Sequence, residues 1–392
     1  MRTFGKALGR ILLLFLLAAV TVGVWKREQV TRLMAVNSLF AAGKITGNFS
    51  NMDTMFLTRA MSRGAAPVSD LPEGGEMTLP DGAKAWITER SVNALVVLKD
   101  GKIRHESYHN GTGPEDLRIS WSVAKSWLSA LFGIVMAEGA IDSLDDPVTK
   151  YVPQLTGSAY DGATVRNVLN MASGVTFDED YLDFWSDINK MGRVLALGGS
   201  MDGFAARLTE TFVEPGRQWQ YVSIDTHVIG MVIRGATGRS VPELLEEKIL
   251  RPMGLEAAPY YVTDGYGVAF VLGGLNLRTR DYARFGQMFL DGGRWNGQQI
   301  VPEDWVIAST TPSAPTAPGK LQYGYQWWAP KDARPGEFFG IGVYGQYVYV
   351  DRPRGVVIAM NSSDRLFKES GVTDGNIAMF RQIAGKLEGA PE

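Results

Sequence analysis

Strand-forming segments lie near both ends of this chain, and the long stretch between them carries almost no strand pattern. Residues 94–98 and 102–108 flank Asp100-Gly101, a strong hairpin signal. Residues 338–350 and 356–360 are rich in aromatic and β-branched residues, which favour strands. The pattern predicts an antiparallel sheet built from both chain ends with flanking helices, in an α/β (α+β) arrangement.

The stretch between these ends, residues 149–255, has the pattern of short helices and loops interrupted by glycines. It predicts a mostly helical subdomain inserted between the two halves of the sheet. Helices are also expected at residues 281–290 and 376–387, the second laid across the sheet.

An apolar run without charges, Ile11 to Trp25, follows three basic residues and precedes Lys26 and Arg27. As a helix it would be roughly 22 Å long, short of a hydrocarbon layer of about 30 Å unless its neighbours join it. Residues 1–27 are therefore expected to be a membrane anchor, with a cleaved signal peptide as the alternative. Either way the basic end stays inside, and the rest is expected outside the cytoplasm, in a bacterial periplasm.

The next residues divide into two further parts. Residues 28–82 are expected to hold a juxtamembrane helix, over 29–44, and a linker rich in proline and glycine, over 65–82. Residues 83–392 are long enough to bury a large core and form the main domain.

Composition excludes several kinds of function. The net charge of -3 argues against nucleic-acid binding, which needs a basic surface. The chain has no cysteine, so disulfides, thiol nucleophiles and cysteine zinc sites are excluded. The three histidines form no zinc-protease pattern, so a metal site is not expected. No motif implies an organic cofactor either.

A chemically suggestive spacing occurs at Ser122-Val123-Ala124-Lys125, ahead of an apolar helical run. Residues three apart are neighbours on a helix surface, so the Ser122 hydroxyl and the Lys125 amine would share a face. The positive helix N-terminus and burial both favour a neutral, basic Lys125. This is the arrangement of a nucleophile beside its base, although the spacing alone occurs by chance in many proteins.

Two later segments could complete such a site. Tyr221 and Ser223 follow a Pro-Gly turn and precede an apolar helix, where a tyrosine could equally be a core residue. Residues 340–346 form a strand interrupted by glycines, and glycine in a strand often allows something to approach the backbone closely.

In this order the three segments resemble the Ser-x-x-Lys, Tyr-x-Asn/Ser and third-strand motifs of the β-lactamase-related serine hydrolases, which include class C β-lactamases and DD-peptidases. The resemblance runs from about residue 94 to the C-terminus. It is nearest to the 6-aminohexanoate-dimer hydrolase and carboxylesterase branch, because of residues 122–126, Tyr181 and residues 340–346. It implies a β-lactamase/transpeptidase-like fold for residues 83–392.

The resemblance also implies roles. Ser122 would be the nucleophile, Lys125 its proton acceptor, and Tyr221 the group that carries a proton to the leaving amine or alcohol. The backbone N–H groups of Ser122 and Val343 would be the oxyanion donors. The expected reaction is hydrolysis of small linear esters or amides through an acyl-serine.

The residues expected to contact substrate on the same basis are Tyr181, Ser223, Gly342, Tyr344 and Trp328. Tyr181 would hydrogen-bond an amide leaving group across the cleft, and Trp328 would wall the cleft or pack beneath it. Ser223 replaces the asparagine usual in lactamases, and Tyr344 replaces a histidine of the nearest branch. The acidic residues 178–187 are expected to be a solvated face, with attraction of a substrate ammonium as the alternative.

The third strand departs from the penicillin-targeting relatives. They carry Lys-Thr-Gly there, whereas this chain has Gly340-Ile341-Gly342 and so lacks the cation that holds a β-lactam carboxylate. Two alternatives stay open at this point. One is a β-lactam- or peptidoglycan-reactive protein, namely a DD-peptidase, a β-lactamase or a penicillin-binding sensor, and the other is an interaction protein with an inactive hydrolase fold.

Overall fold

The computed structural model describes residues 11–13, 15, 20–21 and 23–388. Within those residues, no helix combines the length and apolar character needed to cross a membrane. Much of the predicted anchor over residues 1–27 lies outside the described residues, and its membrane role stays a prediction.

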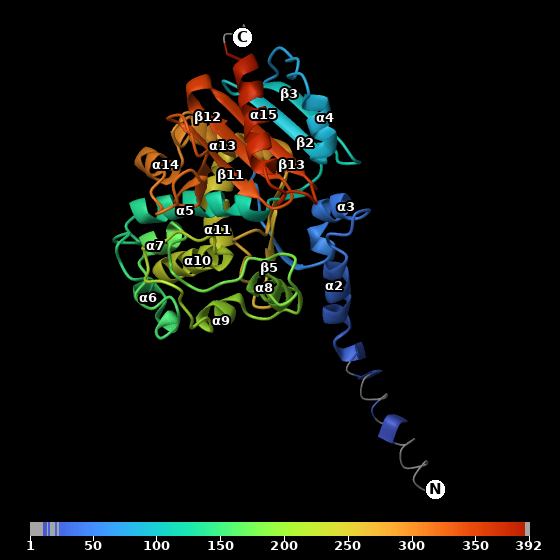
Figure 1. Ribbon diagram of the computed structural model, residues 1–392, viewed down its shortest axis with the longest axis vertical. Helices are drawn as coiled ribbons and strands as arrows, with labels where there is room; N and C mark the ends of the chain where they lie inside the picture. The colour runs from blue at the N-terminus through green and yellow to red at the C-terminus, as the bar shows by residue number, and fades with distance from the viewer. Residues whose placement is uncertain (1–10, 14, 16–19, 22, 389–392) are drawn as a thin grey trace.

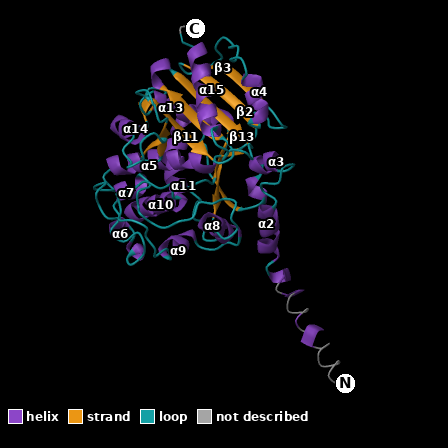
Figure 2. Cartoon of the chain, viewed as in Figure 1, coloured by secondary structure: helices purple, strands orange, loops and turns teal. Residues whose placement is uncertain are grey.

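The core of the structure is a seven-stranded sheet in which every neighbouring pair is antiparallel (Figures 1 and 2). Its strand order is β3-β2-β13-β12-β11-β10-β9. The strands are β2 (Val92–Lys99), β3 (Lys102–Tyr108), β9 (Gln322–Gly324), β10 (Trp327–Ala329), β11 (Glu337–Gly342), β12 (Gln346–Asp351) and β13 (Val356–Ser362). Because β2 pairs with β13, the sheet joins both chain ends, and that prediction is confirmed.

Helices cover both faces of this sheet (Figure 1). Successive side chains of a strand point to opposite faces, and β2 is buried on both. Val96 belongs to the same buried cluster as Trp127 of α5 (Ala124–Ala137) and Phe285 of α13 (Thr279–Leu290). Val97 belongs instead to the cluster of Trp86 in α4 (Ala83–Glu89) and Phe380 in α15 (Val372–Lys386). The near-continuous apolar run of β2 follows from this two-sided burial.

Residues 149–255 form the expected helical subdomain, drawn in green and yellow below α5 in Figure 1. Its α-helices are α6 (Val148–Tyr151), α7 (Val165–Leu169), α8 (Asp187–Ala196), α9 (Met201–Ala206), α10 (Ser223–Thr237), α11 (Val241–Leu245) and α12 (Arg251–Met253), with a π-helical turn at Glu246–Leu250 between the last two. Helix α10 is buried over most of its length and contacts α5, α6, α7 and α9.

A second sheet, of four short strands, was not predicted. It has the order β1-β5-β6-β4, and its strands are β1 (Leu57–Ala60), β4 (Arg118–Ile119), β5 (Tyr260–Thr263) and β6 (Leu275–Leu277). Strand β1 belongs to residues 28–82, which were expected to hold only a helix and a linker. The structure instead packs part of this segment into the core, with Phe49 fully buried.

Two predicted elements are shorter than expected. The helix expected over residues 29–44 ends earlier, as α2 (Arg27–Asn37), and α3 (Ile45–Ser50) follows a turn. The Asn48 side-chain amide donates to the carbonyls of Ser38 and Leu39, at 3.1 and 2.9 Å, and so stabilises the turn.

Residues 338–350 are a hairpin rather than one strand. Tyr344 and Gly345 both adopt positive φ, 60° and 85°, which lets the chain reverse there.

Candidate active site

Ser122 lies in a 3-10 turn, Trp121–Val123, that leads directly into α5. The preceding residue, Trp121, has a φ of 42°, which is uncommon for a residue with a bulky side chain. Such backbone strain concentrates at functional sites, where the surrounding structure holds it in place. The helix was predicted to begin at Ser122, but the residue lies in this tighter turn and the regular helix α5 begins at Ala124.

Lys125, one turn further on, is only 2% exposed. Its Nζ donates to Thr226 Oγ1 at 3.2 Å and approaches the carbonyl oxygen of Ser223 at 3.5 Å. Burial lowers the Lys125 pKa to about 7, because a buried ammonium loses its hydration. A substantial fraction of this amine is neutral near pH 7, so it can accept a proton.

Tyr221 lies against both Ser122 and Lys125. Its ring centroid is 5.3 Å from Lys125 Nζ, and its ring stacks on Trp328 of β10 with centroids 5.6 Å apart. Burial raises the Tyr221 pKa well above its usual range, while hydrogen bonding with Ser122 and Ser223 acts in the opposite direction. The phenol therefore keeps its proton and can donate it. The structure thus brings Ser122, Lys125 and Tyr221 together, although they come from separate parts of the chain.

Strand β11 passes directly beside the nucleophile. A Cβ atom at Gly342 would lie 2.7 Å from the Ser120 carbonyl oxygen and 3.0 Å from the Ser122 amide nitrogen. Real Cβ atoms rarely come so close, so this approach requires glycine. The same strand end brings Val343 to the cleft that Ser122 lines, where the sequence predicts the second oxyanion donor.

Replacing Gly342 by alanine is expected to lower kcat/KM for an ester by about 10²- to 10³-fold. The new methyl group would push β11 away from Ser122 and move the Val343 N–H, and loss of one oxyanion donor has this cost. Gly340→Ala on the same strand is the control, because its Cβ would meet side chains and no backbone atom: the Ser126 hydroxyl oxygen at 3.1 Å and Val123 Cγ1 at 3.5 Å. Equal losses in the two variants would contradict the close approach at Gly342.

Two acidic residues belong to this site. The Glu179 carboxylate accepts the backbone N–H of Ser223, and burial raises its pKa while Lys125 acts to lower it. The prediction of a solvated face is wrong for Glu179, although it holds for the exposed Asp178. Asp225, fully buried, accepts from Tyr160 at 2.7 Å, and burial raises its pKa to about 7. Sequence reasoning gave Glu179 only as one of several acidic residues and did not single out Asp225 on α10, because the local pattern does not show which distant residues each contacts.

A buried network orients the lysine and was also missed. Thr226 accepts from Lys125 and donates its own hydroxyl to Gln326 Oε1 at 2.7 Å. The Gln326 amide donates in turn to the Leu169 carbonyl at 2.8 Å. Thr226 stands one helical turn after Ser223, and that spacing was the only signal in the sequence that could have indicated it.

Two pockets meet at Ser122, and the residues shared by both are Ser122, Tyr181 and Val343. The first, about 390 Å³, is also lined by Tyr221, Trp328, Gly342 and several polar residues. The second, about 350 Å³, is lined mainly by apolar side chains and includes Ser223 and Tyr344. Every predicted substrate-contacting residue therefore lines one of these pockets. Their roles in binding stay predictions.

A lysine side chain gives the first pocket a positive charge, which the third strand itself does not supply. Lys368 lines it, with Nζ 4.5 Å from the centroid of the Tyr181 ring and 4.0 Å from Asp180 Oδ1. It comes from the loop between β13 and α15, outside all the motifs. Glu369 and Asp374 line the same pocket, which therefore presents both signs of charge.

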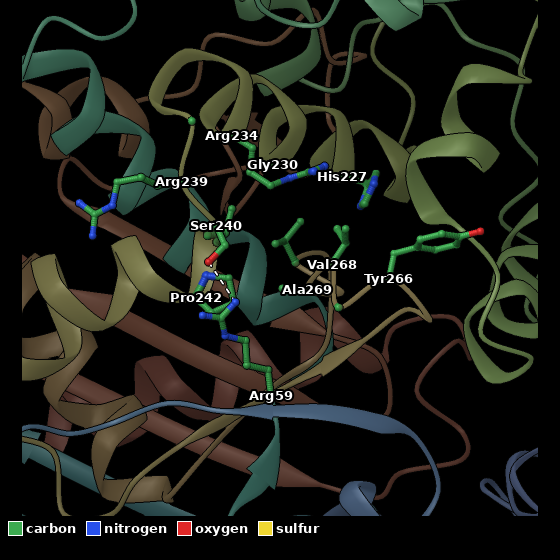
Figure 3. Close-up of a pocket in the computed structure, with 14 residues that line it drawn as sticks. Arg59, His227, Gly230, Arg234, Arg239, Ser240, Pro242, Tyr266, Val268 and Ala269 are labelled. Atoms are coloured by element: carbon green, nitrogen blue, oxygen red, sulfur yellow. Dashed lines mark hydrogen bonds between the residues drawn. The ribbon is translucent and has the colours of Figure 1, made fainter. Parts of the chain in front are cut away.

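A further hollow is lined by His227 and three arginines (Figure 3). Each arginine has a carboxylate partner: Arg59 with Glu243 at 2.8 Å, Arg234 with Asp202 at 2.6 Å, and Arg239 with Glu247 at 2.5 Å. His227 also contacts Asp202, at 2.7 Å. These pairs neutralise the charges. Ser122, Lys125 and Tyr221 do not line this hollow, which we therefore assign no catalytic role.

Comparisons with known proteins identify the family to which the sequence is similar. The Beta-lactamase family model matches residues 87–378. The 6-aminohexanoate-dimer hydrolase of Paenarthrobacter ureafaciens is 31% identical over 334 residues, which cover 80% of this chain and 84% of the relative. A D-aminopeptidase of Brucella anthropi is 28% identical over 176 residues, 42% of this chain and 32% of the relative.

Solved structures show the same fold. A Bacillus anthracis protein described as a 6-aminohexanoate-dimer hydrolase superimposes with a TM-score of 0.80, at 24% identity, over 90% of this chain and 97% of the other. The β-lactamase/transpeptidase-like fold predicted from the motifs is thereby confirmed.

Proposed function

Because the chain belongs to the Beta-lactamase family, a family of hydrolases, we propose that it is a serine hydrolase that cleaves small linear esters or amides through an acyl-Ser122 intermediate. The observation that carries this proposal is the convergence of Ser122, a buried Lys125 and Tyr221 at the junction of two pockets. A nucleophile, a base and a proton donor are what acyl transfer requires.

In the proposed reaction the neutral Lys125 amine takes the proton of Ser122 as its Oγ attacks the carbonyl carbon. The N–H groups of Ser122 and Val343 would stabilise the oxyanion. Tyr221 would protonate the departing oxygen or nitrogen and take a proton back from the Lys125 ammonium, so that the serine proton ends on the leaving group. Water then cleaves the acyl-serine bond. Glu179, whose interaction with Lys125 is attractive, favours the ammonium that forms during attack.

The position of Tyr221 in the lining of the first pocket supports a leaving group there, because only a group near the phenol can receive its proton. Lys368, Glu369 and Asp374 make that pocket suitable for a polar leaving group. Similarity to the relative named as a 6-aminohexanoate-dimer hydrolase supports amides as one substrate class for this chain.

The test is intact-mass analysis of the full chain mixed with a p-nitrophenyl acetate substrate and, separately, with a penicillin, while product release is followed. We expect rapid ester turnover, a transient adduct on Ser122 and little reaction with penicillin. A stable penicillin adduct without ester turnover would instead favour a β-lactam-reactive sensor. No adduct with either reagent would refute the hydrolase proposal.

A further inference from the structure

We propose that the second pocket binds the acyl half of the substrate and takes an uncharged, apolar acyl chain of the fatty-acid type. This inference rests on the proposed function and extends it to the substrate class. Two pockets with different linings meet at Ser122, so each can hold a different half of the substrate.

The position of Tyr221 decides which pocket takes which half. Tyr221 and Trp328 line the first pocket and do not line the second. The leaving group must reach the Tyr221 hydroxyl to be protonated, so it occupies the first pocket. The acyl chain extends from the opposite side of the same carbonyl carbon, and the second pocket is the space available to it beside Ser122 and Val343.

The lining of the second pocket matches a hydrocarbon chain. Its walls include aliphatic and aromatic side chains from widely separated parts of the chain, among them Leu39, Phe56, Ile119, Met191, Phe270 and Leu272. Ligand pockets of this kind gain affinity mainly from burial of apolar surface. The mouth is also apolar, since Leu182 and Phe184 line the pocket and are 88% and 58% exposed.

Charge in the second pocket disfavours a cationic chain end. No aspartate or glutamate is among the described residues that line it, so a terminal ammonium would find no carboxylate there. The charged lining residue is Arg193, whose guanidinium donates to the Phe184 carbonyl at 2.7 Å and lies 4.1 Å from the Phe184 ring centroid. An unpaired ammonium in this pocket would lose its hydration without compensation.

The segment before β1 supplies one wall of this pocket. Leu39, Phe40, Met52 and Phe56 all line it. The Phe40 ring stacks on Tyr344 with centroids 4.7 Å apart and an interplanar angle of 16°. Residues that the sequence indicated as a connection to an anchor therefore help to select the acyl chain, and the test needs the full chain.

The test compares p-nitrophenyl acetate, hexanoate, octanoate and 8-aminooctanoate on the full chain. For the uncharged esters kcat/KM should rise roughly fourfold for each methylene buried, until the pocket is full. The amino-terminated ester should be at least about 10²-fold poorer than octanoate.

Gly192→Leu supplies the blocking variant. Gly192 lies on α8 and lines the pocket, and a Cβ there meets nothing within 4 Å, so the new side chain would enter open space without a clash. We expect the kcat/KM for octanoate to fall at least about tenfold more than the kcat/KM for acetate. Gly385→Leu on α15, also without neighbours within 4 Å, is the matched control and should change neither ester.

Two results would overturn the inference while leaving the proposed function intact: a flat chain-length profile, or equal loss of acetate and octanoate turnover in Gly192→Leu. A preference for the amino-terminated ester would overturn it as well. Failure of the proposed function looks different, because no ester, acetate included, would then be hydrolysed and Ser122 would carry no adduct.

Discussion

Replacing Ser122 by alanine is expected to lower kcat for p-nitrophenyl ester hydrolysis by at least about 10⁴-fold and to abolish the acyl adduct. The hydroxyl is the only atom group removed, and in the proposed reaction it forms the covalent bond that every later step depends on. Ser122 is partly buried and lies in a turn, so the fold should be retained. Ester turnover, intact mass and thermal unfolding together measure the outcome.

Ser129→Ala is the matched control for this experiment. Ser129 lies on the same helix, α5, and its buried hydroxyl donates to the Tyr325 carbonyl at 2.7 Å. Its loss should cost about 1 kcal/mol of stability and leave turnover within about twofold. Wild-type turnover in Ser122→Ala, or an adduct that persists in it, would show that another residue is the nucleophile.

Replacing Lys125 by alanine is expected to lower kcat/KM by about 10³-fold or more, because removal of a positioned general base typically costs 10²–10⁴. The wild-type enzyme should also show a characteristic pH dependence. The base works only as the neutral amine, so kcat/KM should rise with pH through about 7, the pKa to which burial lowers Lys125. Ester hydrolysis measured from about pH 5 to about pH 9 tests both expectations.

The pH profile separates a catalytic role of Lys125 from a structural one. In Lys125→Ala the residual activity should lose the rise near pH 7, and an added small amine should restore part of the rate. If the variant kept the wild-type profile, a different group would be the base. Asp225 would then be the first candidate, because its pKa is also raised to about 7.

Periodicity and motif order predicted the main sheet and the three central residues of the site. The apolar runs of β2 and β13 are long and buried on both faces, so their pattern is strong. The strands of the second sheet span only two to four residues, too few for any periodicity to show. The hairpin at Tyr344 was missed because a positive φ at a tyrosine leaves no mark in the sequence.

The parts of the site that escaped prediction depend on contacts between distant segments. Glu179 looked like one of several surface acids, and only the folded chain brings it to the Ser223 N–H. Lys368 and Gln326 likewise enter the site from loops without motifs. Sequence patterns indicate the local secondary structure and burial of a residue, whereas these residues contact partners many positions away in the chain.

The pairing of β2 with β13 also sets the order in which the protein can assemble. While the chain is being synthesised, β2 can pair with β3, but its other edge stays open until residues 356–362 emerge. Contacts between such distant segments slow folding, because a long loop must close before they form. The apolar residues 94–98 would remain exposed meanwhile, with an unpaired strand edge that invites aggregation. A chain shortened before β13 would consequently accumulate as an aggregation-prone intermediate rather than as a smaller enzyme.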